Sequence, residues 1–249
     1  MHPRSHFPTD YDGYAPTYAW ARSAVPWVID PLAAIVAGLP SGSTVLEIGC
    51  GTGNYIHAFS TRRPDLGYVG FDLSEQMLRE ARSRAGSALF LCGDATRAFP
   101  CADSICGLAF SVDVVHHLDH LPTFFAESAR VLAADGQLVI VTDSERTWEH
   151  RSLTTFFPEL MPIEIARYPL LSEMHADAAA AGLRLVEAEI IKGRIPLTDE
   201  FLAQLGAKCS SAMRLITDEQ HRTGMARVRD AQNRGEQWVS CYEMLRYAA

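Results

Sequence analysis

The chain has 249 residues, of which 48% are hydrophobic and 21% charged, and its formal net charge is -8. This length suits one large α/β domain with a sizeable core. Between residues 101 and 183 there are 12 Asp/Glu against 4 Lys/Arg, which argues against a polyanion as the main partner. The six cysteines form no C-x-x-C pair, and neither a signal peptide nor an apolar run of membrane-spanning length is present. We therefore expect a cytoplasmic protein with reduced thiols and no membrane partner.

The N-terminal 40 residues are expected to form an arm followed by a helix. Residues 1–24 are rich in Tyr, Pro and Asp, which favours an aromatic arm packed on the core. The apolar spacing from Val25 to Leu39 is helical. Pro26 suits its first turn, whereas Pro31 is expected to kink or restart the helix.

The most informative stretch is an apolar segment with one acid, Val45–Ile48, which breaks into three alternate glycines before a helical pattern that begins near Asn54. We interpret it as a strand, a tight turn and a helix. Gly49, Gly51 and Gly53 permit positive φ and place no Cβ between the backbone and a ligand. A cofactor could therefore lie against the turn and the helix N-terminus.

The glycine spacing differs from the dinucleotide pattern G-x-G-x-x-G, since the third glycine comes one residue early. An acid, Glu47, also stands two residues before the first glycine. This combination resembles motif I of the class I S-adenosylmethionine-dependent methyltransferases.

Further strands end in acids in a way that extends the resemblance. Gly67–Asp72 reads as a second strand, followed by a helix capped by Ser74, and Asp72 lies 19 residues after Gly53. An acid at this place accepts hydrogen bonds from ribose hydroxyls in nucleoside-binding doubly wound folds. Residues 88–95 form an expected third strand that ends near Asp94, and residues 104–112 a fourth that runs into the loop of residues 111–118. The carboxyl ends of these strands should meet at one crevice.

The order of elements continues as in the family through a helix at 121–132 and a strand at 137–142, so that the resemblance covers residues 43–143. The rest of the chain is expected to contain a helix at 171–181, a strand at 183–191, helices at 198–216 and 217–234, and a final strand at 237–247. A capping box, Thr217 with Gln220, marks the start of the last helix.

The resemblance implies an α/β fold, a Rossmann-like three-layer sandwich. Its seven-stranded sheet would be mostly parallel, with an antiparallel last strand and a helical insertion before that strand. We expect a single domain, residues 1–249, with an N-terminal arm and helix (1–40) and a cofactor-binding core (43–143). Substrate-side insertions would occupy residues 144–170 and 196–235.

The resemblance also implies S-adenosylmethionine as cofactor. Glu47 would order the turn near the methionine amino group, and Asp94 would face the adenine amine. The full set of implied cofactor-binding residues is Glu47, Gly49, Cys50, Gly51, Thr52, Gly53, Asp72, Leu73, Met77, Asp94, Ala95, Ser111 and Val112. Candidate substrate-binding residues are Tyr14, Tyr18, Arg22, Trp148 and Arg151, although the last two could equally anchor the insertion by packing.

His116 and His117 are the candidate catalytic residues, because a histidine pair is frequent in this loop of the family. Either could line the pocket or act as a general base near neutral pH. His116 and His120 also have the i, i+4 spacing of a metal site. No motif such as H-E-x-x-H frames them, so no metal is expected.

The expected function is methyl transfer from S-adenosylmethionine to a small-molecule acceptor by a monomer or homodimer, without a nucleic-acid partner. The alternatives are methylation of a protein or RNA, and a catalytically silent cofactor-binding protein with a regulatory or scaffold role. The sequence leaves open which atom accepts the methyl group.

Overall fold

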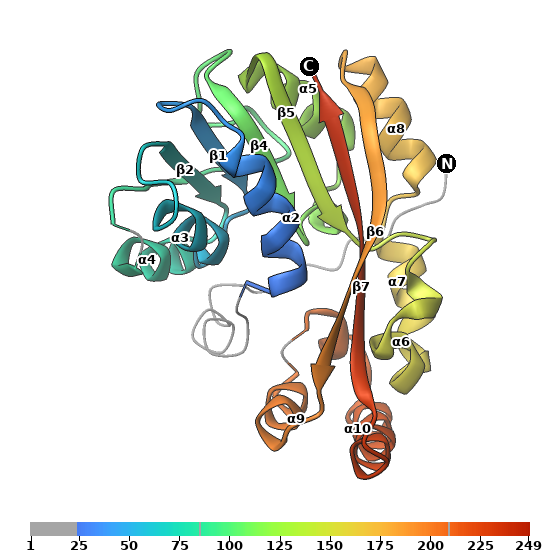
Figure 1. Cartoon of the computed structure of the whole chain (residues 1–249). Helices are drawn as coiled ribbons and strands as arrows, with labels where there is room; N and C mark the ends of the chain where they lie inside the picture. The colour runs from blue at the N-terminus through green and yellow to red at the C-terminus, as the bar shows by residue number, and fades with distance from the viewer. Residues whose placement is uncertain (1–23, 85, 209) are drawn as a thin grey trace.

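The structure, a computed structural model, describes residues 24–84, 86–208 and 210–249. Within these residues, seven strands form one sheet in the order β3-β2-β1-β4-β5-β7-β6 (Figure 1). The strands are β1 (Thr44–Ile48), β2 (Gly67–Asp72), β3 (Leu89–Cys92), β4 (Cys106–Val112), β5 (Leu132–Thr142), β6 (Arg184–Pro196) and β7 (Gln237–Ala248). Strands β1 to β5 pair in parallel, and β7 lies antiparallel between β5 and β6. The expected fold class, with its antiparallel last strand, is confirmed.

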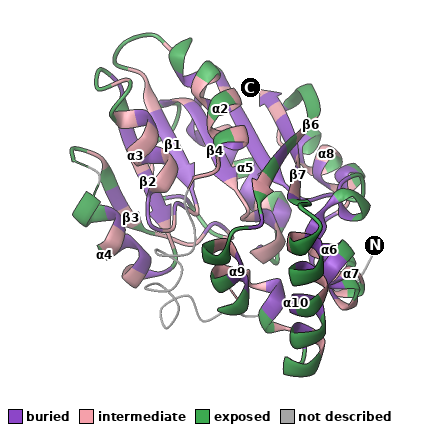
Figure 2. Ribbon diagram, turned by 60° about the horizontal axis from the view of Figure 1, so that its bottom comes forward, coloured by how far each residue is buried: buried purple, intermediate pink, exposed green. Residues whose placement is uncertain are grey.

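Helices cover both faces of this sheet. The helices are α2 (Pro26–Ala37), α3 (Asn54–Ser60), α4 (Glu75–Arg84), α5 (Leu121–Val131), α6 (Ser152–Phe156), α7 (Met161–Arg167), α8 (Leu171–Ala180), α9 (Asp199–Gly206) and α10 (Asp218–Asn233). Helices α2, α3 and α4 contribute to one buried apolar cluster with the sheet, and α5 and α8 to another. Figure 2 shows the buried residues concentrated along the strands between these layers. The three-layer arrangement follows because β1 and β4 are apolar on both faces and must be covered on both.

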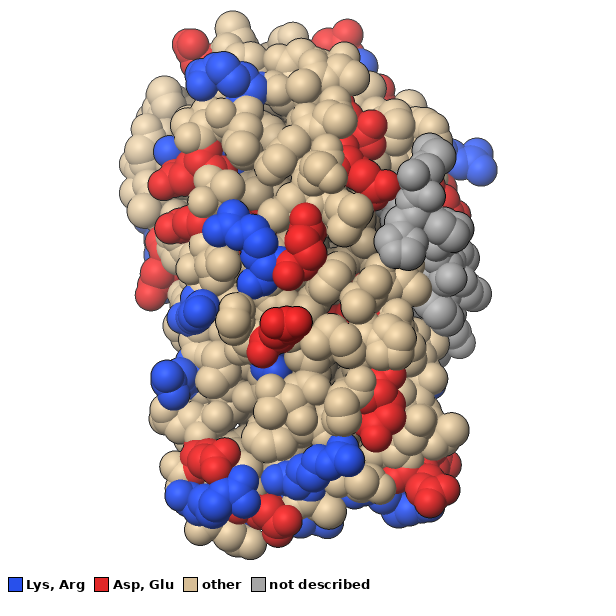
Figure 3. All heavy atoms as spheres, turned by 90° about the vertical axis from the view of Figure 1, so that its right-hand side faces the viewer, with Lys and Arg blue, Asp and Glu red and all other residues tan. Residues whose placement is uncertain are grey.

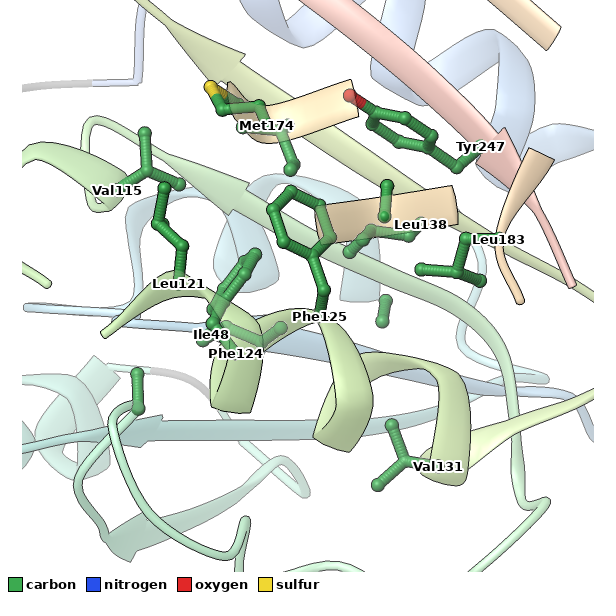
Figure 4. Close-up of a cluster of buried hydrophobic side chains, with 14 of the residues drawn as sticks. Ile48, Val115, Leu121, Phe124, Phe125, Val131, Leu138, Met174, Leu183 and Tyr247 are labelled. Atoms are coloured by element: carbon green, nitrogen blue, oxygen red, sulfur yellow. The ribbon is translucent and has the colours of Figure 1, made fainter. Parts of the chain in front are cut away.

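The cluster beneath α5 shows how the sheet is held. Phe124 and Phe125 on α5 are fully buried and cross at nearly right angles, with their ring centroids 5.3 Å apart. Phe125 also meets Tyr247 of β7 at 5.9 Å (Figure 4). The last strand is therefore fixed to the centre of the parallel sheet by aromatic packing.

A third apolar cluster lies beyond the carboxyl ends of the strands, between α6, α9, α10 and the start of β7. We call residues 195–238 the cap. It includes the two helices α9 and α10 inserted between β6 and β7, as predicted from the sequence. Helix α10 begins with the expected capping box, in which Thr217 and Gln220 each accept a backbone N–H.

Several element boundaries differ from the sequence-based expectation. The helix predicted for residues 198–216 ends at Gly206, and a separate short turn follows at Ala212–Arg214. Glycine is a poor helix former, and Lys208 adopts a positive φ of 52° just beyond it. Pro31 does not interrupt α2, whose residues Val28, Leu32 and Val36 remain buried as one face. Packing on the sheet thus outweighs the lost hydrogen bond.

Two strands are longer than predicted. Strand β5 begins at Leu132 and runs through Asp135–Gly136, where a turn is predicted, with an irregular register opposite Cys106 and Leu108. Strand β6 continues to Pro196 because it pairs along its length with β7, as far as Pro196 opposite Gln237. This long β6–β7 pair carries the cap away from the sheet (Figure 1).

Candidate functional site

The glycine turn after β1 is held tightly against β2. The N–H groups of Gly49 and Cys50 both donate to the carbonyl of Phe71, at 2.8 and 3.0 Å. Gly49 has φ of 69°, and a Cβ on it would lie 2.6 Å from a methyl group of Val114. Only glycine fits this position without displacing the loop that follows β4.

Two acids predicted from the sequence organise the neighbouring loops. Asp72 accepts the N–H of Gly51 at 2.8 Å through one oxygen and the N–H of Ser74 at 2.9 Å through the other. It thereby joins the end of β2 to the glycine turn and to the start of α4. Asp94 accepts the N–H and hydroxyl of Thr96. Partial burial acts to raise the pKa of Asp94, but these hydrogen bonds and the charge of Arg97 outweigh it and lower the pKa.

These loops surround a cavity of about 170 Å³, which we call the glycine-turn cavity. It is lined by Gly49, Gly51, Phe71, Asp72, Leu73, Met77, Gly93, Asp94, Ala95, Thr96, Val112, Asp113, Val114, His117 and Leu118. The structure therefore brings together most of the residues predicted to bind a cofactor. Leu73 is 72% exposed at this cavity, which is unusual for a leucine.

The other predicted cofactor residues lie behind the lining: Glu47, Cys50, Thr52, Gly53 and Ser111. The Glu47 carboxylate is buried and accepts the N–H of Ile56 at 3.3 Å, which fixes the start of α3. Burial raises the pKa of Glu47; the Ile56 N–H opposes this and the charge of Asp72 adds to it. The Cys50 thiol faces Gly70, where a Cβ would come within 2.9 Å of its sulfur. Burial raises the pKa of this thiol, so Cys50 fills space beneath the turn.

A second cavity, of about 340 Å³, lies beside the first and is called here the cap cavity. It is lined by the start of α2, the loops after β4 and β5, helices α6 and α7, and the cap. Asp113 and His117 line both cavities. Asp113 has φ of 58°, its N–H donates to Val141, and its carboxylate accepts the Tyr242 hydroxyl at 3.4 Å. The two cavities thus meet at a rigidly held loop.

The histidines of this loop have different positions. His116 lines the cap cavity, and its ring contacts those of His117 and Tyr168 in tilted arrangements, with ring centroids at 3.9 and 4.4 Å. His120 instead caps α5, where its ring nitrogen accepts the N–H of Thr123. Within the described ranges, no three His, Cys, Asp or Glu side chains are grouped as metal ligands.

Buried charges form part of the lining of the cap cavity. Arg151 pairs with Asp143 and with Glu164, the latter at 2.5 Å. Arg167 pairs with the other oxygen of Glu164 at 3.4 Å and donates to the Ser211 hydroxyl at 3.0 Å. We call Asp143, Arg151, Glu164 and Arg167 the ion network; all four line the cavity and are at most 5% exposed.

The two predicted substrate residues that the structure describes lie in different surroundings. Arg151 lines the cap cavity, whereas Trp148 is buried outside the lining of either cavity. Tyr14, Tyr18 and Arg22 lie outside the described residues. The sequence does not point to Glu164 or Arg167, because no local pattern links them to Arg151. Asp113 and Asp143 could be found by the rule that identifies Asp72, since each directly follows a strand.

In the part of the chain that the structure describes, no helix is long and apolar enough to cross a membrane. On the face drawn in Figure 3, basic and acidic side chains are interspersed among uncharged ones.

Comparison with known proteins gives a consistent result. Residues 46–140 match a family model described as a methyltransferase domain. A malonyl-[acyl-carrier protein] O-methyltransferase from Geobacter sulfurreducens is 27% identical over 72% of this chain and 67% of its own length. A tRNA (carboxymethyluridine(34)-5-O)-methyltransferase from Arabidopsis thaliana is 30% identical over 58% of this chain, but the match spans only 34% of that protein.

A trans-aconitate 2-methyltransferase from Methylobacterium nodulans is 28% identical over 62% of this chain and 57% of its own length. Among solved structures, a putative methyltransferase from an antibiotic biosynthesis pathway of Anabaena variabilis has a TM-score of 0.67 at 20% identity, covering 92% of this chain and 99% of that one. With the matched domain, the strand order and the glycine turn in agreement, the chain belongs to the class I S-adenosylmethionine-dependent methyltransferases.

Proposed function

We propose that the chain binds S-adenosylmethionine in the glycine-turn cavity and transfers its methyl group to a small molecule held in the cap cavity. The observation that carries this proposal is that Asp113 and His117 line both cavities. A group bound on one side of this loop would face a group bound on the other.

The residues of the glycine-turn cavity fit this cofactor. Gly49, Gly51 and Gly93 line it without side chains, which leaves room for close approach to the backbone. The Asp72 carboxylate would receive the ribose hydroxyls, and that of Asp94 the adenine amine. The exposed Leu73 side chain at the edge provides an apolar surface for the adenine ring.

When bound, the cofactor supplies a methyl group already activated by a positive sulfonium, with S-adenosylhomocysteine as product. The protein then has to align the acceptor and exclude water. The ordered loop at Asp113 would set the alignment, and the cap would exclude water. His117 is the group at the boundary that would take a proton from an acceptor hydroxyl.

A small acceptor is supported by the enclosed volume of the cap cavity, which is near the lower end of the range for small-molecule sites. Two of the relatives are named for malonyl-[acyl-carrier protein] and trans-aconitate. The tRNA methyltransferase relative supports RNA as a second candidate acceptor. RNA binding would require phosphate contacts and a steep loss of affinity with salt, which a titration with total tRNA at two salt concentrations would detect.

Calorimetric titration with S-adenosylmethionine tests the cofactor, and absence of heat at millimolar ligand would overturn the proposal. A metabolite panel assayed for S-adenosylhomocysteine release then tests turnover. Cofactor binding without turnover on any small molecule or tRNA would favour the catalytically silent alternative.

His117→Ala tests the assignment at the boundary. We expect kcat to fall by about 10²- to 10⁴-fold if His117 is a general base, with little change in cofactor affinity. His150→Ala is the control, because His150 is exposed and lines neither of the two cavities. A loss of folded protein in His117→Ala would instead assign that side chain a packing role.

A further inference from the structure

The ion network in the lining of the cap cavity has two atoms left unsatisfied. Oδ1 of Asp143 and Nε of Arg151 are buried, and neither has a hydrogen-bond partner among the described residues. Both residues line the cavity and are 5% exposed. Leaving a buried acceptor and a buried donor unpaired is costly, so a molecule that pairs with both would be favoured here.

The unsatisfied atoms define the chemistry of such a molecule. Asp143 offers an acceptor, and Arg151, whose two terminal nitrogens already contact Asp143 and Glu164, offers its Nε–H as a donor. A hydroxyl matches this pair, because it donates one hydrogen and accepts another. A carboxylate would accept from Arg151 but would place its charge beside the Asp143 oxygen.

The charges that line the cavity point the same way. Asp113, Asp143 and Glu164 oppose two arginines, Arg151 and Arg167, so with the lining residues His116 and His117 neutral the set has a net charge of -1. Burial raises the pKa of Glu164 against the opposing effect of the arginines, and its protonation would bring the total only to zero. In either state no surplus positive charge remains to compensate a buried carboxylate.

The same cavity also has an apolar part in its lining, most of it from the cap. This part comprises Ile195, Phe201, Leu205, Met213, Trp238 and Val239. Most of these side chains belong to or pack against the buried cluster of the cap. The cavity thus combines the buried charges of the ion network with apolar side chains.

We infer that the acceptor is an uncharged, hydroxyl-bearing molecule with an apolar body, oriented by Asp143 and Arg151, and that carboxylates are discriminated against. Its hydroxyl donates to Oδ1 of Asp143 and accepts from Nε of Arg151, while the apolar body lies against the cap. This inference rests on the proposed function, and it separates the chain from relatives named for malonyl and trans-aconitate acceptors, which carry carboxyl groups.

The test uses the full chain saturated with S-adenosylhomocysteine and pairs of probes with one skeleton. 3-Phenylpropan-1-ol is compared with 3-phenylpropanoate, and cinnamyl alcohol with cinnamate. Binding is followed by calorimetry and by tryptophan fluorescence, since Trp27 and Trp238 line the cavity. Work at pH 8 keeps ordinary histidines neutral. We expect each alcohol to bind at least about tenfold more tightly than its acid.

Asp143→Asn removes the negative charge at nearly constant volume and should shrink this ratio. Glu236→Gln is the matched control, because it makes the same charge change at an exposed site beside Arg234 and should leave the ratio unchanged. The comparison in the unmodified protein stands even where Asp143→Asn does not fold.

The inference is overturned if the acids bind as tightly as their alcohols. It is also overturned if none of the four probes binds. If the ratio of alcohol to acid affinity is unchanged in Asp143→Asn, Asp143 does not orient the acceptor. Titration with S-adenosylmethionine in the same preparation keeps the two proposals apart. If the cofactor binds and the alcohols are not preferred, only the acceptor inference fails; if the cofactor does not bind, the proposed function fails.

Discussion

The two cavities are built by different physical means. The glycine-turn cavity depends on backbone geometry: three glycines with positive φ, and an acid, Asp72, that accepts two backbone N–H groups. The cap cavity depends on side-chain charges buried together, from Asp143 at the end of β5 to Ser211 in the cap. Mutations should therefore affect the first mainly through fit and cofactor affinity, and the second mainly through uncompensated charge.

Arg151→Leu should have the largest effect on stability. It leaves Asp143 buried without its cation and Glu164 with Arg167 alone, and breaking a buried pair in this way costs about 3 to 5 kcal/mol. Urea unfolding followed by circular dichroism measures the loss. Arg234→Leu is the control, since Arg234 and its partner Glu236 are both about half exposed, and solvent screens such surface pairs so that they contribute little to stability. A similar small loss in both variants would contradict the view that the ion network supports the cap cavity.

This contrast explains what the sequence could predict of the site. Asp72 and Asp94 follow strands at the edge where ligands bind in this class of fold, so their positions come directly from the strand pattern. Arg151 is a candidate because it lies in the insertion expected at residues 144–170, but its pairing with Glu164 requires α6 and α7 to pack together. That packing depends on tertiary contacts, which no local periodicity encodes.

Asp72→Ala should have the next largest effect, and on cofactor affinity. Loss of charge-assisted hydrogen bonds to the ribose would weaken binding by about 1.5 to 3 kcal/mol, and the turn would also lose its tie to Gly51. Calorimetric titration with S-adenosylmethionine measures the change. Asp65→Ala is the control, because Asp65 pairs with Arg63 on the surface and lines neither cavity. An unchanged affinity in Asp72→Ala would show that the ribose does not bind at Asp72.

The sheet could be predicted more completely than the cap for a related reason. Strands β1, β2 and β4 are short apolar runs bounded by turn residues, and their order follows the resemblance to the family. In the cap, the predicted helix 198–216 has continuous apolar spacing but contains Gly206, and the chain ends the helix there. The length of β6 depends on pairing with β7, some 50 residues later, so its boundary is set by a non-local contact.

Gly49→Ala and Gly182→Ala form a matched pair with a smaller expected effect. Both glycines have positive φ, 69° and 85°, so each alanine should cost about 1 to 2 kcal/mol of stability. A Cβ at Gly182 meets nothing within 4 Å, whereas one at Gly49 meets Val114, which lines the glycine-turn cavity. Cofactor affinity should therefore fall in Gly49→Ala and stay unchanged in Gly182→Ala. Equal affinities would mean that the close approach at Gly49 does not shape the cofactor site.

The smallest expected effect is a change in how stability depends on pH, and two glutamates should show it with opposite sign. Burial raises the pKa of Glu47, so the folded chain keeps a proton that the unfolded chain has lost, and this group reduces stability as pH rises above its ordinary pKa. The hydrogen bonds from Arg130 lower the pKa of Glu127, so its contribution is present above its ordinary pKa and disappears as pH falls.

Thermal unfolding of Glu47→Gln and Glu127→Gln at pH 3, pH 5 and pH 8 measures this difference. Relative to the unmodified chain, Glu47→Gln should be more stable at pH 8 than at pH 5, because glutamine keeps an acceptor for the Ile56 N–H without the ionisation cost. Relative to the unmodified chain, Glu127→Gln should be less stable at pH 5 and pH 8 than at pH 3, because the unmodified chain has its full charged contact with Arg130 only above the ordinary pKa of Glu127. If the two variants show parallel pH profiles, the surroundings of Glu47 do not disfavour its charged form. The interior beneath the glycine turn would then be more polar than the burial of Glu47 indicates.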